Sequence, residues 1–80
     1  MLDLEGYKVL VSASTRGIGF GIAKVLLMNG ASVVINGRSN ESVSKAAEKL
    51  KKYGKVHGIA ADITEHEDAK RLVEEAARFL

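Results

Sequence analysis

A glycine-rich stretch near the start of the chain has the residue types of a phosphate-binding turn. The sequence "SASTRGIG" runs from Ser12 to Gly19, between an apolar run and a helical pattern. A helix N-terminus exposes unpaired N–H groups and a partial positive charge, and together these bind phosphate. Glycine lets the backbone approach an anion because it has no Cβ. The stretch therefore predicts a phosphate site; a turn with glycines for purely steric reasons is the alternative.

Backbone amides and hydroxyls are the candidate donors in this turn. The N–H groups near Gly17 and Ile18 are expected to face a diphosphate, and Gly19 is expected to let the helix pack closely on the strand. Ser14 and Thr15 add hydroxyl donors. A P-loop is excluded, because no Gly-Lys-Ser/Thr follows the glycines. The strand–turn–helix context indicates a dinucleotide instead.

The residues that follow the second apolar run discriminate between NAD and NADP. An NAD site usually has an acidic residue about 20 positions beyond the glycines, which binds the ribose 2′-hydroxyl. Here that stretch reads "INGRS" and contains no carboxylate. Arg38 instead offers a guanidinium that pairs with a 2′-phosphate through two hydrogen bonds, and Arg16 is placed to reach the same group. The pair predicts NADP(H), with solvated surface arginines as the alternative.

Asp62 follows the third apolar run, at the sheet edge where ligands bind in doubly wound folds. Its carboxylate is expected to accept a hydrogen bond from the adenine amino group, and helix capping is the alternative. A metal site is not expected, because the chain has no cysteine and His57 and His66 lack metal-ligand spacing.

The elements that position these residues alternate regularly. Val/Ile-rich runs predict three strands, over residues 8–12, 32–36 and 55–61, and a helical pattern follows each. The βαβαβα order predicts a parallel sheet with strand order 3-2-1 and the first two helices on one face. This is the first half of a Rossmann-type, doubly wound α/β fold.

Each helical pattern has a predicted apolar face and predicted ends. The first helix is expected to end at Gly30, the second to run from an Asn40 cap to Gly54, and the third to open with a Thr64–Glu67 capping box. The predicted faces are Ile18, Ile22, Val25 and Leu26 in the first helix, Val43, Ala46, Ala47 and Leu50 in the second, and Ala69, Leu72, Val73, Ala76 and Leu80 in the third.

The predicted topology leaves the apolar first strand at a sheet edge. An exposed edge of this kind is a liability that native proteins avoid. We therefore expect residues 1–80 to be the N-terminal part of a longer dinucleotide-binding domain, or a partner to cover the edge. The net charge of +2 gives no case for nucleic acid or membrane binding, and without an apolar leader a cytoplasmic location is expected.

Together these motifs resemble the N-terminal, coenzyme-binding part of the short-chain dehydrogenase/reductase family over all 80 residues. "SASTRGIG" is similar to the family's Thr-Gly-x-x-x-Gly-x-Gly turn, and "AADIT" to the segment in which Asp62 and Ile63 would contact adenine. Ser12 keeps the hydroxyl of the usual threonine. Ala13 replaces the first glycine and would be strained if the turn requires a positive φ there.

The resemblance implies an NADP-dependent oxidoreductase, similar to 3-oxoacyl-carrier-protein reductases, that transfers hydride between nicotinamide and a carbonyl or alcohol. In the family an acid at Gly37 marks NAD use, whereas basic residues such as Arg16 or Arg38 mark NADP use; Ser39 adds a hydroxyl. The family's catalytic serine and Tyr-x-x-x-Lys have no match here, so the 80 residues alone are expected to be inactive. The resemblance also implies a small-molecule substrate and a full-length protein that forms a homo-oligomer. The alternative is a non-catalytic protein of the same fold that acts as a dinucleotide sensor or scaffold.

Overall fold

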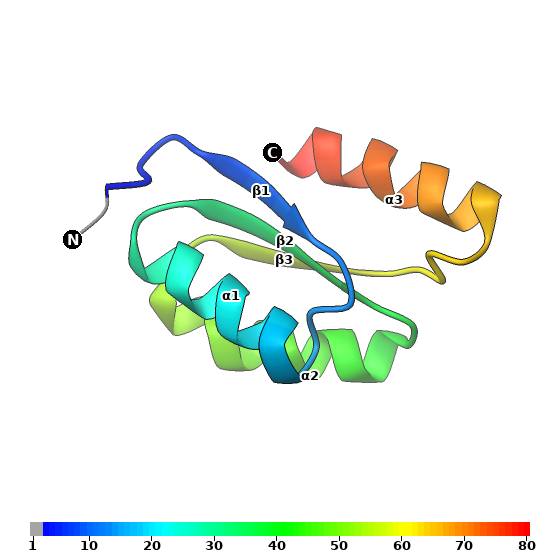
Figure 1. Cartoon of the computed structure of the whole chain (residues 1–80), viewed down its shortest axis with the longest axis horizontal. Helices are drawn as coiled ribbons and strands as arrows, with labels where there is room; N and C mark the ends of the chain where they lie inside the picture. Colours follow the sequence, from blue (N-terminus) through cyan, green and yellow to red (C-terminus); the bar gives the residue numbers. More distant parts are fainter. Residues whose placement is uncertain (1–2) are drawn as a thin grey trace.

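The computed structural model describes residues 3–80 and contains the predicted alternation of strands and helices (Figure 1). Its elements, in chain order, are β1 (Lys8–Val11), α1 (Gly17–Met28), β2 (Ser32–Gly37), α2 (Asn40–Leu50), a short 3-10 turn (Lys51–Tyr53), β3 (Val56–Ala60) and α3 (His66–Phe79). Each predicted strand is confirmed to within a residue or so at its ends.

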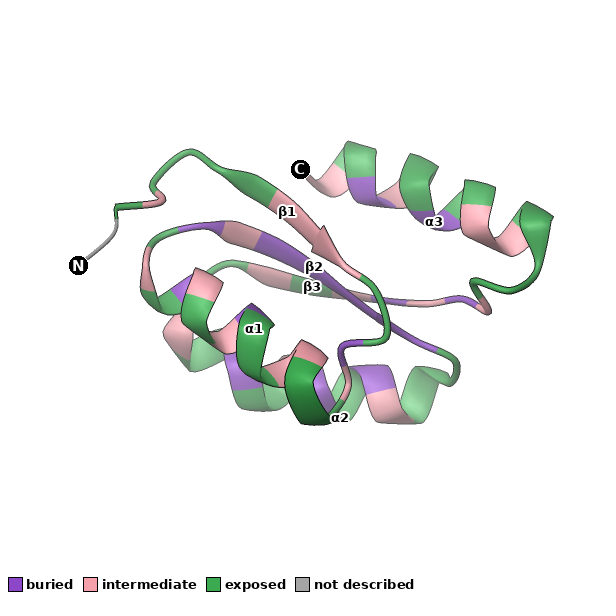
Figure 2. Ribbon diagram, in the orientation of Figure 1, coloured by how far each residue is buried: buried purple, intermediate pink, exposed green. Residues whose placement is uncertain are grey.

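The three strands form one parallel sheet in the order β1-β2-β3, which confirms the predicted topology. Val9 of β1 lies opposite Val33 of β2, and Val33 in turn lies opposite Val56 of β3. The central strand is buried on both faces, as its continuous apolar sequence predicted (Figure 2). All three strands therefore present their carboxyl ends at the same edge of the sheet.

Helices cover the two faces of the sheet unequally. Both α1 and α2 lie on one face and α3 lies on the other (Figure 1). Leu27, Ile35 and Leu50 belong to the core beneath α1 and α2, whereas Val34 and Leu72 belong to the core beneath α3. On the face covered by α1 and α2, the turn between β1 and α1 is bonded to the end of β2 and shares a cavity with the start of α2.

The predicted apolar face of α1 is wrong. Ile18, Ile22 and Val25 are 84%, 49% and 57% exposed, whereas the buried residues of the helix are Ala23 and Leu27. On the side of the helix opposite Ile22, Lys24 lies over the ring of Tyr53 in the turn after α2. The exposed stripe therefore points away from α2, because the sequence of α1 is apolar on nearly every side and cannot indicate which side packs.

Three predictions for the other helices are also wrong: two concern the residue that caps the helix, and one concerns the apolar face. Ser39, not Asn40, is the N-cap of α2, because its hydroxyl accepts the N–H of Ser42. No capping box forms at α3, because the Thr64 hydroxyl donates to Asp62 instead of capping the helix. Val73 is exposed on α3, although its neighbour Leu72 is buried as predicted.

The second helix ends earlier than predicted, because α2 stops at Leu50 and a 3-10 turn continues the chain to Gly54. Other packing predictions are confirmed. The apolar face of α2 is buried through Val43, Ala46 and Leu50, and Gly30 follows α1 with a φ of +100°. Within residues 3–80, strand β1 pairs with β2 alone, so its outer side is open as expected. No helix in the described part of the chain has the length and apolar character needed to cross a membrane.

Candidate dinucleotide-binding site

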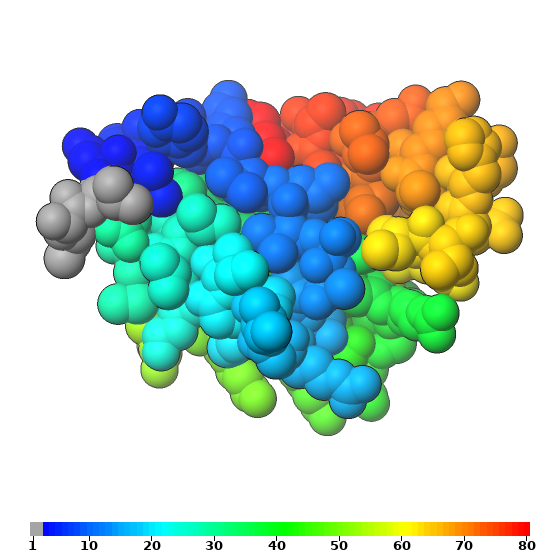
Figure 3. Space-filling view, in the orientation of Figure 1, coloured from blue at the N-terminus to red at the C-terminus, as the bar shows by residue number. Residues whose placement is uncertain are grey.

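A cavity of about 680 Å³ lies at the carboxyl edge of the sheet. The turn after β1, the end of β2, the exposed side of α2 and the segment after β3 all contribute to its walls. In the space-filling view these segments, coloured blue, green and yellow, meet around it (Figure 3). Parallel α/β sheets bind ligands at this edge, so the cavity is where the sequence predicted a ligand.

The first turn of α1 directly follows Arg16, a residue of the cavity wall, and keeps its amides free. No acceptor among residues 3–80 takes the N–H groups of Gly17, Ile18 or Gly19. Arg16 precedes the helix and does not cap it through its side chain, and the first turn holds no acidic residue. Three donors and the positive end of the helix dipole are therefore available to an anion.

Gly17 leaves room above these amides. Its φ is +65°, a conformation that favours glycine, and a Cβ added there would meet no protein atom within 4 Å. The space that a side chain would fill is thus open to a ligand approaching the backbone.

Gly19 allows close packing of the helix, as predicted, but against the turn after β1 and not against the strand itself. A Cβ at this position would lie 2.6 Å from the carbonyl oxygen of Ala13 and 3.0 Å from the Cα of Ser14. Ala13 itself has a φ of +50°, so the strain expected from replacing the family's glycine is present. The turn is therefore held tightly against the helix by backbone contact.

Ser14 is not a free donor, which corrects its predicted role. The residue is completely buried, and its hydroxyl donates to the carbonyl of Val11 at 2.6 Å and accepts the N–H of Asn36 at 2.9 Å. Its own N–H donates to the carbonyl of Asn36. These bonds fasten the turn to the end of β2, so the hydroxyl is used within the fold.

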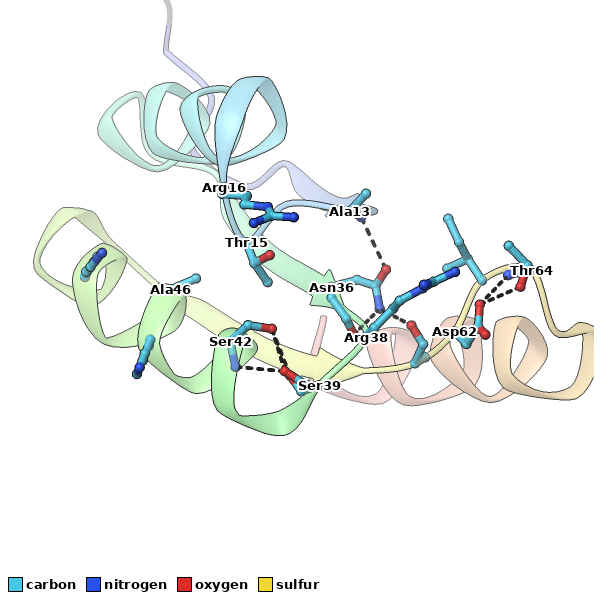
Figure 4. A pocket seen from close by; sticks show the side chains of 15 residues that line it. Ala13, Thr15, Arg16, Asn36, Arg38, Ser39, Ser42, Ala46, Asp62 and Thr64 are labelled. Carbon is cyan, nitrogen blue, oxygen red and sulfur yellow. Dashed lines mark hydrogen bonds between the residues drawn. The ribbon is translucent and has the colours of Figure 1, made fainter.

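Asn36 is the residue of β2 to which the turn is hydrogen-bonded, and it was not singled out from the sequence. Only 1% of the residue is exposed. Its side-chain oxygen accepts the N–H of Ala13 at 3.3 Å, and its Nδ2 donates to the carbonyls of Ile59 at 3.1 Å and Ala61 at 3.2 Å (Figure 4). One carboxamide thus links the ends of all three strands. A buried asparagine at a strand end is the signal that could have found it.

The two arginines predicted to read a 2′-phosphate both line the cavity. Arg16 comes from the turn before α1 and Arg38 from the end of β2, and both are exposed (Figure 4). Between them, Gly37 is buried with no space for a side chain, because a Cβ there would collide with the Cγ2 of Thr15. The methyl group of Thr15 therefore occupies the space that an acidic side chain at position 37, the mark of NAD use, would need.

Asp62 lies at the other end of the cavity (Figure 4). Its Oδ1 accepts hydrogen bonds from the hydroxyl of Thr64 at 2.6 Å and from the N–H of Thr64 at 3.0 Å. These bonds lower the pKa of the Asp62 carboxyl, against a small opposing effect of desolvation, and the nearby charge of Arg38 lowers it further. The carboxylate is thus ionised at neutral pH and able to accept a further hydrogen bond.

The structure brings six of the eleven predicted binding residues to the cavity wall. These are Thr15, Arg16, Arg38, Ser39, Asp62 and Ile63. The backbone of Gly17, Ile18 and Gly19 forms the helix start beside it, whereas Ser12 is exposed just beyond β1 and is not part of the wall. The wall also contains Ser42, Lys45 and Lys49 of α2, which the sequence alone did not single out. Their spacing along one side of a helix was the available signal.

Within residues 3–80, no group of three or more His, Asp or Glu side chains is placed to hold a metal ion. The polar groups of the site are backbone amides, hydroxyls, two arginines, two lysines and one carboxylate. This set matches a ligand that has phosphate groups at one end and an amino-bearing ring at the other.

Comparisons with known proteins agree with this geometry. The family model for short chain dehydrogenase matches residues 7–80. An uncharacterized oxidoreductase, YvrD, of Bacillus subtilis is 44% identical over 73 residues, which are 91% of this chain and 28% of that protein. The 3-oxoacyl-(acyl-carrier-protein) reductase FabG of Aquifex aeolicus is 40% identical over 76 residues, 92% of this chain and 31% of that protein.

A solved structure also superimposes closely on the chain. The Pseudomonas aeruginosa RhlG/NADP active-site complex matches with a TM-score of 0.92 and 36% identity, over 98% of this chain and 30% of that one. The chain thus spans about a third or less of the relatives it matches. The similarity covers the elements that build the cavity.

Proposed function

Because the chain belongs to the short-chain dehydrogenase family, we propose that it is the NADP(H)-binding part of an oxidoreductase that acts on a carbonyl or alcohol. The observation that carries the proposal is the presence of unpartnered amides at the start of α1, directly after Arg16, which lines one cavity together with Arg38. The likeness to RhlG, whose solved structure is a complex with NADP, supports the same cofactor.

The residues present fit a dinucleotide diphosphate. The amides of Gly17, Ile18 and Gly19 point from the positive end of α1, and the open space above Gly17 admits the anion. Thr15 adds a hydroxyl from the cavity wall. We therefore place the diphosphate at this helix start.

The end of β2 fits the phosphorylated ribose. Arg38 and Arg16 supply the charge for a 2′-phosphate, and Ser39 adds a hydroxyl beside them. Position 37 is a glycine and so offers no carboxylate to a free 2′-hydroxyl, and the Thr15 methyl group fills the space that a side chain there would require. This selects NADP(H) over NAD(H).

The segment after β3 fits the adenine. Asp62 is fixed by Thr64 and accepts the adenine amino group, while Ile63 contacts the ring. The side chain of Ile63 is 45% exposed, which leaves it accessible to an apolar ring face.

When bound, the nicotinamide supplies the hydride, and this chain supplies the binding and orientation of its adenosine half. The proton donor belongs to another part of the protein, because neither tyrosine here begins a Tyr-x-x-x-Lys pair: Val11 and His57 stand four residues after Tyr7 and Tyr53. The open outer side of β1 is consistent with a sheet that continues beyond this half.

Arg38→Ala tests the proposed cofactor. The wild-type chain is expected to bind NADPH more tightly than NADH, and the variant to lose about 10- to 100-fold in NADPH affinity, because charge-assisted hydrogen bonds contribute about 1.5–3 kcal/mol. Affinity for NADH should change little. Titration by nicotinamide fluorescence measures both, with Arg78→Ala on the far helix α3 as the control. An unchanged NADPH-to-NADH ratio in Arg38→Ala removes Arg38 from the site.

A further inference from the structure

Two lysines of α2 extend the cationic wall beyond the arginines. Lys45 and Lys49 line the same cavity as Arg16 and Arg38, and both are exposed. With Ser42 they occupy positions i, i+3 and i+7 of the helix, which lie on one side of it. This side borders the buried stripe of Val43, Ala46 and Leu50 and faces the cavity. The lysines thus project from the element that begins at the end of β2.

The charges on this wall are not neutralised within the fold. In residues 3–80, the ion pairs join Lys51 to Glu48 and Arg71 to Asp68 and Glu75, and none involves a basic residue of the cavity wall. Four basic side chains line the cavity, and Asp62 is the one carboxylate among the described residues that line it. Asp62 already accepts two hydrogen bonds from Thr64. The wall therefore has an excess of positive charge.

The position of the lysines indicates that they attract the 2′-phosphate and not the diphosphate. The diphosphate is placed on the amides of α1, whereas Lys45 and Lys49 stand on α2, whose N-cap Ser39 directly follows Arg38. This is the side on which the proposed ribose and its 2′-phosphate lie. An exposed lysine attracts a phosphate through water over about one Debye length, 8–10 Å, with a modest energy that falls with added salt.

We propose that Lys45 and Lys49 are specificity-determining residues that increase the preference for a 2′-phosphorylated adenine nucleotide. The proposal rests on the proposed function, since it concerns the same site, and it adds a third and fourth cation to the pair recognised from the sequence. Arg38 and Arg16 form the directed hydrogen bonds, and the lysines raise the potential at the phosphate. The ordinary role of exposed helix lysines, solvation of a surface, predicts no such selectivity.

The test compares two adenosine phosphates that lack the nicotinamide half of the cofactor and so need only the adenosine end of the site. Adenosine 2′,5′-bisphosphate and 5′-ADP are titrated calorimetrically into the wild-type chain, Lys45→Gln, Lys49→Gln and the double variant. Each ligand carries two phosphates; the two ligands differ at the 2′ position and by about one negative charge near neutral pH. Lys70→Gln, at an exposed lysine on α3 across the sheet, is the control with the same loss of charge as each single variant.

The double variant is expected to lower the affinity ratio of the bisphosphate to ADP by about 3- to 10-fold at low salt, with a smaller effect at high salt. Lys70→Gln should keep the wild-type ratio. A double variant that keeps the wild-type ratio, or that weakens both ligands equally, overturns the role of the lysines. If Arg38→Ala still abolishes the preference in that case, the proposed NADP site stands. A wild-type chain without any preference for the bisphosphate instead overturns the proposed cofactor, and the lysine proposal with it.

Discussion

Asn36→Leu is expected to destabilise the chain by about 3–5 kcal/mol, because it leaves several buried polar groups without partners. The carboxamide satisfies the N–H of Ala13 and donates to the carbonyls of Ile59 and Ala61. Each unsatisfied buried group costs about 1–3 kcal/mol, and a domain of this size has about 5 kcal/mol of stability or a little more. Urea unfolding followed by circular dichroism should show a largely unfolded variant.

Asn36→Asp separates hydrogen bonding from volume. It keeps the acceptor for Ala13 but replaces the donor with a carboxylate oxygen that faces the carbonyls of Ile59 and Ala61. Burial and these carbonyls should raise the pKa of the new carboxyl in the folded state, so the loss of stability relative to wild type shrinks as the pH falls toward about 4.

Asn40→Ala is the matched control for both variants. Asn40 is exposed at the first position of α2, and its replacement should change stability by less than about 0.5 kcal/mol. An Asn36→Leu chain as stable as Asn40→Ala would show that the carboxamide network contributes nothing.

Gly19→Ala is the second large effect, with an expected loss of about 1–3 kcal/mol and a weakened affinity for NADPH. The new Cβ would lie 2.6 Å from the Ala13 carbonyl oxygen, and that oxygen belongs to backbone that Asn36 and Ser14 hold in place. The start of α1 must therefore move away from the turn. Displacing three amides from the positions that receive the diphosphate should lower affinity at least tenfold, since about 1.4 kcal/mol of lost binding is sufficient.

Gly21→Ala provides the control, on the same helix and two residues away. A Cβ at Gly21 meets nothing within 4 Å, and the residue lies inside α1 with no positive φ. Alanine is favoured over glycine in a helix interior by about 1 kcal/mol, so this variant should be more stable than wild type. Thermal melting of the two variants checks the opposite signs; equal shifts would contradict the close contact of Gly19 with the turn.

The strands and the turn were predictable because each depends on local sequence, and the strand order followed from the right-handed crossover of βαβ units. Val33, Val34 and Ile35 form a continuous apolar run of the kind that parallel central strands require, and the structure buries all three completely. The glycines after β1 predicted a turn that packs closely on the helix and leaves its backbone accessible, and the close contact at Gly19 and the open space at Gly17 match these two features. Periodicity and turn chemistry were sufficient for these features.

The packed side of α1 was not predictable, because apolar residues surround the helix. Ile22 and Leu27 are equally apolar, yet Leu27 is 2% exposed and Ile22 is 49% exposed. Only the position of the sheet decides between them, and that is a tertiary property. In α2, by contrast, lysines and serines occupy the outer side, and its buried face was predicted correctly.

The hydrogen-bond partners of the serine and threonine hydroxyls could not be predicted from the sequence either. Ser14 and Thr15 are adjacent and chemically alike, but Ser14 is completely buried against β2 while Thr15 lines the cavity. The partner that decides this, Asn36, lies 22 residues further along the chain. Thr64 likewise bonds to Asp62 instead of capping α3, because the carboxylate lies within reach of its hydroxyl. Short-range patterns identify donors but not their partners.

Amide NMR tests the central claim most directly, that the main-chain N–H groups at the start of α1 receive the diphosphate. The isotope-labelled chain is titrated with NADPH and the ¹H–¹⁵N signals are followed. The signals of Gly17, Ile18 and Gly19 should show the largest shifts, since their N–H groups have no partner within residues 3–80. Saturable NADPH binding that leaves these three signals in place would contradict the account.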